Sequence, residues 1–317
     1  MFPIQSEQLR ERFLKDNNVS IKFLKSPYFE DRYDLYNKYY NLNEVLENFL
    51  SVYNKVGNEE KYFELYNKLK DDVINYLNSS PEMLFFAREE DMSKFTIKNK
   101  NLPKASIYKP SNHERIFISI DMKSANFTAL RHYNSLIVKN KDTYEDFLRE
   151  FTDIDYFTKS KYIRQVVFGN VNPSRQISYE KYLMDKVVIT LSEFIDIKHF
   201  VSFQNDEIVL DVTEMILKEN FSETISKIKK ILNDFKKEGI ILKFELFELR
   251  KIENTDGYLK KMLPESDKDG IVFKGLNSLE MPFVLRKHFN EEPIDSDFYF
   301  LHEGRMAKLL EPIVPIL

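Results

Sequence analysis

The stretch FVSFQNDEIVLDV, residues 200–212, places two acidic residues, Asp206 and Glu207, between two apolar-rich segments. Short apolar segments on either side of a polar turn predict a β-hairpin. A hairpin of this kind can simply reverse the chain, or it can present its acidic residues to a ligand. The segments around it decide between these roles.

The pattern on both sides predicts an α+β fold. A strand at 115–120, RIFISI, precedes a mostly helical stretch, and further helices and a strand enclose the hairpin. This order favours an antiparallel sheet with helices on one face. In the helix after the hairpin, Ser222 is the expected N-cap and Gly239 the expected end. The expected helical and strand segments are 127–168, 177–195, 222–239 and 240–252.

The chain outside this core divides into three regions. Residues 1–100 carry apolar residues at helical spacing and predict antiparallel helices, with a helix over 31–56 ended by Gly57-Asn58. Residues 101–114, rich in proline and polar residues, are an expected linker to a core at 115–252. The expected accessory segment, 253–317, holds a strand pair at 270–275 and 281–288 and a short helix near the C-terminus.

Composition narrows the classes of function. The 47 basic and 51 acidic residues give a net charge of −4, so any nucleic acid must be held by a local basic surface. The chain has no cysteine, which excludes disulfides and thiolate metal sites. The N-terminus lacks the apolar core of a secretory signal, and no segment is long and apolar enough to cross a membrane. These features predict a soluble, cytoplasmic protein without membrane contact.

Two carboxylates occupy special positions in this layout. Asp121 directly follows the 115–120 strand, and Asp206 lies at the hairpin turn. If the strand and the hairpin are neighbours in the sheet, the two side chains approach each other. Carboxylate oxygens suit Mg²⁺ or Mn²⁺, and a pair of such ions about 4 Å apart supports phosphoryl transfer. The sequence therefore predicts a metal site at Asp121 and Asp206.

Three segments resemble the motifs of palm-domain nucleic-acid polymerases. IDMKSANF, 120–127, resembles motif A of reverse transcriptases, and the 200–212 stretch resembles motif C. ILNDFKKEGIILKFE, 231–245, resembles motif D. The order and the compact spacing are similar to the palms of reverse transcriptases and RNA-dependent polymerases, over about residues 115–250. The resemblance implies a palm-type, RRM-like sheet and an enzyme that binds two Mg²⁺ ions and adds nucleotides to a 3′-hydroxyl by two-metal-ion catalysis.

The resemblance also implies roles for single residues. Asp121 and Asp206 would bind metal, with Glu207 a third nearby carboxylate and the main-chain carbonyl of Met122 a further ligand. Lys243, in motif D, is a candidate proton donor to pyrophosphate. The other candidates would contact the nucleotide: Lys123, Ser124, Asn126, Arg164 and Arg175.

Arg164 and Asn126 depart from the reverse-transcriptase pattern. GNVNPSRQ, 169–176, lacks the usual Pro-Gln-Gly of motif B, whereas Arg164 lies four positions before Phe168-Gly169, as in family A polymerases. Asn126 occupies the position of the bulky aromatic that excludes a 2′-hydroxyl, which hints at ribonucleotides.

The same residues are also consistent with other functions. Nucleotide cyclases and tRNA-His guanylyltransferases use the same palm, although the glycines expected in those families are missing. Asn205 stands where reverse transcriptases have the first acid of motif C, so an inactive module that binds nucleic acid or protein is a third reading. The polymerase reading implies nucleoside triphosphates and an RNA or DNA primer and template as partners. A second protein that completes the polymerase is a further expected partner.

Overall fold

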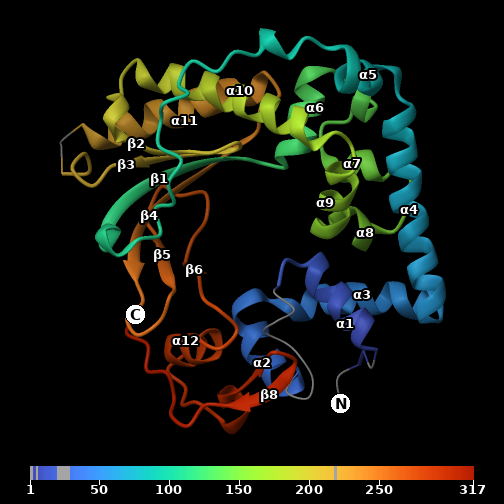
Figure 1. The fold of residues 1–317 in the computed structure, drawn as a ribbon, viewed down its shortest axis with the longest axis vertical. Helices are drawn as coiled ribbons and strands as arrows, with labels where there is room; N and C mark the ends of the chain where they lie inside the picture. Colours follow the sequence, from blue (N-terminus) through green and yellow to red (C-terminus); the bar gives the residue numbers. More distant parts are fainter. Residues whose placement is uncertain (1–2, 5, 20–28, 218–219) are drawn as a thin grey trace.

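The structure is a computed structural model that describes residues 3–4, 6–19, 29–217 and 220–317 (Figure 1). These residues form an α+β fold with twelve α-helices, one six-stranded sheet and one two-stranded sheet. The N-terminal region is helical, as predicted. In the described part of the chain, no helix combines the length and the apolar character needed to cross a membrane.

The central sheet is antiparallel throughout, with the strand order β2-β3-β1-β4-β5-β6. The predicted first strand is therefore flanked by the hairpin on one side and by the predicted 240–252 strand on the other. The sheet continues beyond residue 252, because β5 and β6 extend it. The strands are β1 (Arg115–Met122), β2 (Phe200–Phe203), β3 (Glu207–Asp211), β4 (Leu242–Lys251), β5 (Tyr258–Met262) and β6 (Ile271–Lys274).

Different parts of the chain pack against the two faces of the sheet. Ile118 and Ile120 of β1 belong to the main core, on the face covered by helices α10 (Pro173–Ser192) and α11 (Phe221–Lys237) (Figure 1). Phe117 points to the other face, where it packs against Ile107 of the predicted linker. The linker therefore covers the Phe117 end of this face, whereas Asp121, near the other end of the strand, stays partly exposed.

Four short helices connect β1 to α10. They are α6 (Ala125–Tyr133), α7 (Tyr144–Leu148), α8 (Asp155–Lys159) and α9 (Lys161–Gly169). α11 ends where predicted, with Gly239 in the left-handed region at φ +90°, but it begins at Phe221 after the N-cap position Asn220. Ser222 therefore lies inside the helix, so the predicted cap was wrong by two residues.

The N-terminal region contains more helices than the pattern indicated. The expected helix over 31–56 is broken at Asn41, which adopts a left-handed conformation at φ 52° that asparagine tolerates well. Gly57 ends the second piece as predicted. The N-terminal helices are α1 (Glu7–Asp16), α2 (Phe29–Tyr40), α3 (Leu42–Val56), α4 (Glu59–Ser79) and α5 (Pro81–Leu84), followed by a π-helical turn (Phe85–Glu89).

The C-terminal prediction was partly wrong. The 270–275 strand is confirmed as β6, but MPFVLRKH forms the helix α12 (Met281–His288), with Pro282 in its first turn. A short apolar segment cannot be assigned to helix or strand by periodicity alone, which explains the error. The expected C-terminal helix is instead a hairpin of β7 (Tyr299–His302) and β8 (Arg305–Lys308), whose turn residues Glu303 and Gly304 both have positive φ.

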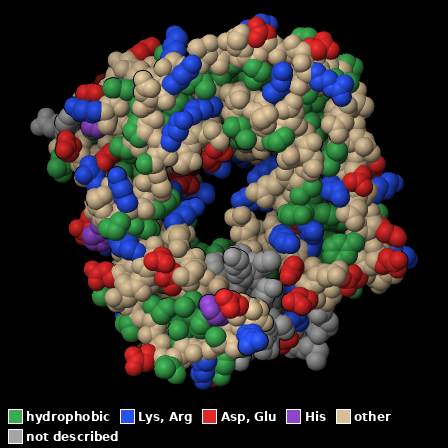
Figure 2. Space-filling model, viewed as in Figure 1, with side chains coloured by type: hydrophobic (Ala, Val, Ile, Leu, Met, Phe, Trp, Pro, Cys, Tyr) green, Lys and Arg blue, Asp and Glu red, His purple; other side chains and the backbone are tan. Residues whose placement is uncertain are grey.

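Short 3-10 turns join several of these elements. They are η2 (Met92–Lys94), η3 (Pro110–Asn112), η4 (Ser135–Val138), η5 (Ile197–His199) and η6 (Asp295–Phe298). The described residues as a whole are arranged as a ring around a central opening, which is visible in the space-filling view (Figure 2). The sheet forms one side of the ring, α4 and α9 lie on the opposite side, and α2 and α12 meet at the bottom (Figure 1).

Candidate functional site

The sheet brings Asp121 and the hairpin turn together. Asp121 is paired with Glu207 across β1 and β3, and the main-chain N–H of Met122 donates to the carbonyl of Asp206 at 2.8 Å. The predicted neighbourhood of the first strand and the hairpin is therefore confirmed. Because the end of β1 lies beside the β2–β3 turn, two carboxylates far apart in the sequence share one edge of the sheet.

The electrostatics of this pair show that the two carboxylates act on each other. Burial raises the pKa of Asp206, and the negative charge of Asp121 raises it further. On its other side Asp121 forms an ion pair with Lys243, whose Nζ lies 2.9 Å from its Oδ2. This lysine places a positive charge beside both carboxylates, since its charge also acts on Asp206.

Glu207 lies close to the pair and has partners of its own. Burial raises its pKa, and the charges of Asp121 and Asp206 raise it further, while its Oε1 accepts a hydrogen bond from the Ser119 hydroxyl. In the described part of the chain, no three His, Cys, Asp or Glu side chains form a group that could hold a metal ion. The predicted third carboxylate therefore lies beside the pair without joining it.

Lys161 lies among basic side chains from separate elements: Arg164 of α9, Lys243 of β4 opposite Asp121, and Lys274 of β6, which the strand register places level with the Arg115 end of β1. The pKa of Lys161 is lowered, first by burial and then by the nearby positive charges of Arg164, Lys274 and Lys243. We call Lys161, Arg164, Lys243 and Lys274 the cationic cluster. Within the described residues, Lys161, Arg164 and Lys274 form no ion pair with a carboxylate. Positive charge is thus concentrated here although the chain as a whole is acidic.

Arg164 is held directly beside the loop that follows β1. Its Nη1 donates to the Oγ of Ser124 at 3.0 Å, and Ser124 begins α6 in a left-handed conformation at φ 49°. The structure therefore joins two of the predicted nucleotide-contacting residues, which are 40 positions apart in the sequence.

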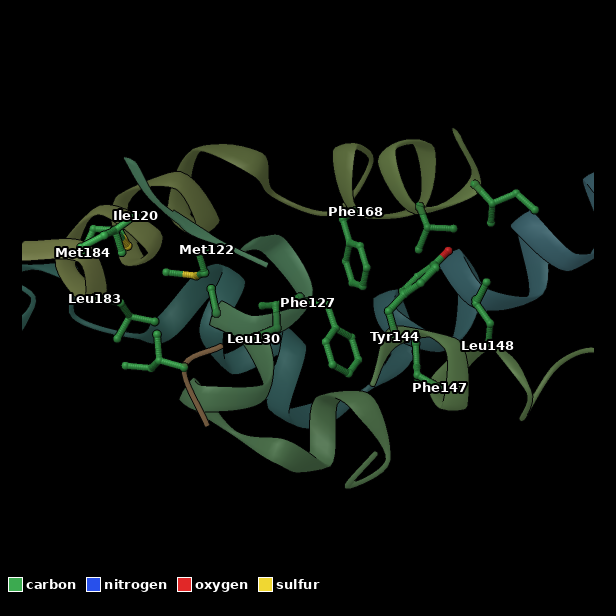
Figure 3. Close-up of a cluster of buried hydrophobic side chains, with 14 of the residues drawn as sticks. Ile120, Met122, Phe127, Leu130, Tyr144, Phe147, Leu148, Phe168, Leu183 and Met184 are labelled. Atoms are coloured by element: carbon green, nitrogen blue, oxygen red, sulfur yellow. The ribbon is translucent and has the colours of Figure 1, made fainter. Parts of the chain in front are cut away.

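A buried aromatic and aliphatic cluster holds these elements in place (Figure 3). Phe127 of α6 and Phe168 of α9 lie with ring centroids 6.4 Å apart, and both rings are buried. The same cluster contains Ile120 and Met122 of β1 and, from α7 and α10, Tyr144, Phe147, Leu148, Leu183 and Met184 (Figure 3). The positions of Arg164 and Asp121 relative to each other are therefore fixed by packing.

The structure also shows a site residue that the sequence did not indicate. Glu180 of α10 is only 4% exposed, and it accepts a hydrogen bond from the Asn126 amide at 2.9 Å. Burial raises its pKa to about 7, and the charge of Asp206 adds to the shift. The sequence feature that could have identified Glu180 is its position as an acidic residue on the apolar side of this helix, beside Tyr179 and Leu183.

Two predicted contacts lie apart from the cluster. Arg175 donates from Nη1 to the main-chain carbonyls of Phe86 and Glu90, at 2.9 and 2.7 Å, so its guanidinium anchors the start of α10 to the end of the N-terminal region. Lys123 is exposed, and the described residues include no contact between its side chain and the cationic cluster. Neither side chain belongs to the site as the structure shows it.

The donor set fits a hard divalent cation. Mg²⁺ often uses one or two protein carboxylates and completes its shell with water and substrate phosphates. Asp121 and Asp206 supply two such groups, and the raised pKa of Asp206 reflects burial and the nearby charge of Asp121, a repulsion that a cation would relieve. A site of two carboxylates is consistent with an ion that arrives together with a phosphate ligand.

Comparison with protein-family models, curated proteins and solved structures finds no match. The function is therefore argued from the chemistry of the site. That chemistry combines two interacting carboxylates, four basic side chains from both sides of the opening and a buried acid–amide pair.

Proposed function

We propose that the protein is a nucleotidyltransferase that adds nucleotides to a nucleic-acid 3′-hydroxyl on a palm-type sheet, with Mg²⁺ or Mn²⁺ as cofactor. The observation that carries this proposal is the convergence of Asp121 and Asp206 beside the cationic cluster. Carboxylates that bind a divalent cation, next to basic groups that bind phosphate, are the two requirements of phosphoryl transfer.

Asp121 and Asp206 would hold the cation, and Lys243 would be released from Asp121 when the cation binds. The bound ion would activate the attacking hydroxyl and offset charge on the triphosphate. The main-chain carbonyl of Met122 is a further candidate ligand, because Met122 directly follows Asp121 in the strand.

The cationic cluster would bind the triphosphate. Arg164 can present several N–H donors to phosphate oxygens in a fixed plane, and its bond to Ser124 restricts its orientation. Lys161 and Lys274 approach from α9 and β6, so the phosphates would be held from two sides. Lys243 carries a proton at Nζ that the leaving pyrophosphate would accept.

The test is nucleotide addition by the purified chain with Mg²⁺ or Mn²⁺. Labelled NTPs or dNTPs are incubated with primed and unprimed strands, and the products are resolved by length. We expect Asp121→Asn and Asp206→Asn each to lower the rate at least about 100-fold, because each removes a charged ligand. Asp234→Asn, at an exposed position on α11, makes the same change of charge away from the site.

Product formation by the Asp121→Asn/Asp206→Asn double variant at the wild-type rate would refute the proposal. Reactions without nucleic acid show whether free nucleotides are cyclised, which would indicate a cyclase on the same sheet. Binding of strands without any product in either reaction would indicate an inactive binding module.

A further inference from the structure

We propose that the ring encircles the strand on which the protein acts, so that a linear polynucleotide enters the central opening end first. This inference rests on the proposed function, because it places the nucleic acid that the site would use. It concerns the path of the strand and predicts that binding itself depends on a free end, whereas nucleotide addition alone requires only that a 3′-hydroxyl reach the site.

The described residues close the ring through packed contacts on every side. α6 packs on α10, α9 packs on α1 and α4, and α3 packs on α8. α2 then contacts α12 and η6, which follow the sheet strand β6 in the chain. The circuit from the sheet through the helices and back to the sheet is therefore continuous (Figures 1 and 2).

The contact that closes the ring joins the N-terminal and C-terminal regions, and part of it is buried. The guanidinium of Arg32, only 4% exposed, donates to the main-chain carbonyls of Ser296, at 2.8 Å, and of Tyr299. Lys38 forms an ion pair with Glu291 at the surface. A buried guanidinium bonded to main-chain carbonyls is a specific contact, since an imperfect fit would leave a desolvated charge unpaired.

Tyr39 closes the ring directly onto the sheet. Its hydroxyl accepts from the main-chain N–H of Phe273 at 3.0 Å and donates to the carbonyl of Ile271 at 3.3 Å. β6 is the last strand of the sheet, so this tyrosine occupies hydrogen-bonding groups of an edge that has no further strand.

The candidate site faces the opening from both sides. Lys161 comes from α9 and Lys274 from β6, elements on opposite sides of the opening, and the two side chains are close enough for their charges to act on each other (Figure 1). The space-filling view shows basic side chains around the opening (Figure 2). A polyanion in the opening would meet positive charge on both flanks, which favours binding of a phosphate backbone.

A closed ring distinguishes strands by topology. A linear single strand can thread through it, whereas a covalently closed circle can enter only if the contact between α2 and α12 opens. The substrate class is therefore a linear polynucleotide with a free end, and the site would meet that end as it emerges beside Asp121.

The experiment locks the ring and compares the two topologies. Because the chain has no cysteine, Lys38→Cys and Glu291→Cys introduce the only thiols, which a bis-maleimide can join across the closing contact. Binding of a linear strand of about 30 nucleotides and of a circle with the same sequence is measured by fluorescence anisotropy. The controls are the Lys38→Cys single variant treated with the same reagent and the double variant left unlocked.

We expect the locked ring to bind the linear strand and to bind the circle at least tenfold more weakly. Equal affinity for the two forms would overturn the inference, because a strand on the outer surface needs no free end. Binding of neither form by the locked and unlocked proteins would overturn it as well. Wild-type protein provides a second measurement. When the ring stays closed, a linear strand blocked at both ends with streptavidin should bind at least tenfold more weakly than the same strand with open ends. Equal binding of the blocked and open strands counts against threading.

Nucleotide addition to the same linear strand separates this inference from the proposed function. Addition to the linear strand by a locked protein that binds the circle equally well overturns the threading alone. Binding that depends on free ends, without addition in Mg²⁺ or Mn²⁺, overturns the proposed function alone.

Discussion

Single residues at the site differ in how far the sequence could indicate them. Asp121 and Asp206 were predictable because each stands where an apolar strand ends, and strand ends in one sheet share an edge. Glu180 was not predicted, because nothing local shows that its helix face turns toward Asp206. The contacts that Arg175 makes could not be predicted for the same reason, since its partners belong to a segment 85 to 89 positions earlier.

Glu180 makes the stability of the protein depend on pH. Its carboxyl has a pKa of about 7 in the folded chain against an ordinary value of 4.5, so the folded state keeps the proton longer than the unfolded state. The free energy of unfolding should therefore fall as pH rises from about 4.5 through 7. Glu180→Gln removes this loss, and we expect it to gain roughly 2 to 3 kcal/mol over wild type between pH 5 and pH 8.

Urea denaturation at several pH values, without divalent ions, measures this difference. Glu47→Gln makes the same charge change at an exposed position within α3, so it reports the effect of net charge. Parallel pH curves for Glu180→Gln and wild type would contradict the prediction.

Asn126 should influence the choice of sugar if the chain adds nucleotides. Its amide N–H is held by Glu180, which leaves Oδ1 to accept a hydrogen bond from a 2′-hydroxyl. We expect Asn126→Ala to lower kcat/KM for ribonucleotides by up to about tenfold, the value of one net hydrogen bond. The matching deoxyribonucleotides are the internal control, and an equal loss for both sugars would show that Asn126 has only a structural role.

Among the elements, long periodic segments were predictable and short apolar segments were not. The helix α10 and the strands β1, β3 and β4 were predicted because length or alternation identified them. MPFVLRKH, 281–288, was misassigned because eight residues fit either a buried strand or a buried helix. The break at Asn41 depends on a residue in the left-handed conformation, and apart from glycine few residues in a sequence indicate that conformation.

The helix α9 offers a test of how the N-terminal region supports the site. Ser160 caps α9, because its Oγ accepts from the N–H of Ile163 at 3.1 Å, and its hydroxyl donates to the buried carboxylate of Asp16 at 2.6 Å. Ser160→Ala removes both bonds, and we expect it to lower the free energy of unfolding by about 2 kcal/mol.

Ser178→Ala is the matched control for this change, because Ser178 lies exposed on α10 and bonds only to the carbonyl of Ser174. Urea denaturation should show a much smaller effect for it. Equal destabilisation by the two variants would indicate that neither the cap nor the bond to Asp16 matters.

At the scale of the whole molecule, closure of the ring could not be predicted from the sequence. It depends on contacts between α2 and the segment from β6 to η6, more than 230 positions apart, and no periodic pattern encodes such a pairing. The predicted division into a core and an accessory segment also missed that β5 and β6 continue the central sheet. The site and the closing contact are linked through this sheet, since β4 carries Lys243 and β6 carries Lys274.

Tyr39→Phe tests the closing contact without removing its aromatic packing. The substitution keeps the aromatic side chain, whose centroid lies 5.3 Å from that of Phe273 in the native chain, and deletes the hydroxyl that bonds to Phe273 and Ile271. We expect the main-chain amide of Phe273 to exchange its hydrogen at least about tenfold faster, since each lost bond contributes about 1 kcal/mol. Amides of β1 and β4 should keep their exchange rates.

Tyr182→Phe is the control, because its hydroxyl has no hydrogen-bond partner among the described residues. Faster exchange throughout the sheet would mean that Tyr39 supports global stability, whereas faster exchange confined to β6 would show that the ring opens at this contact.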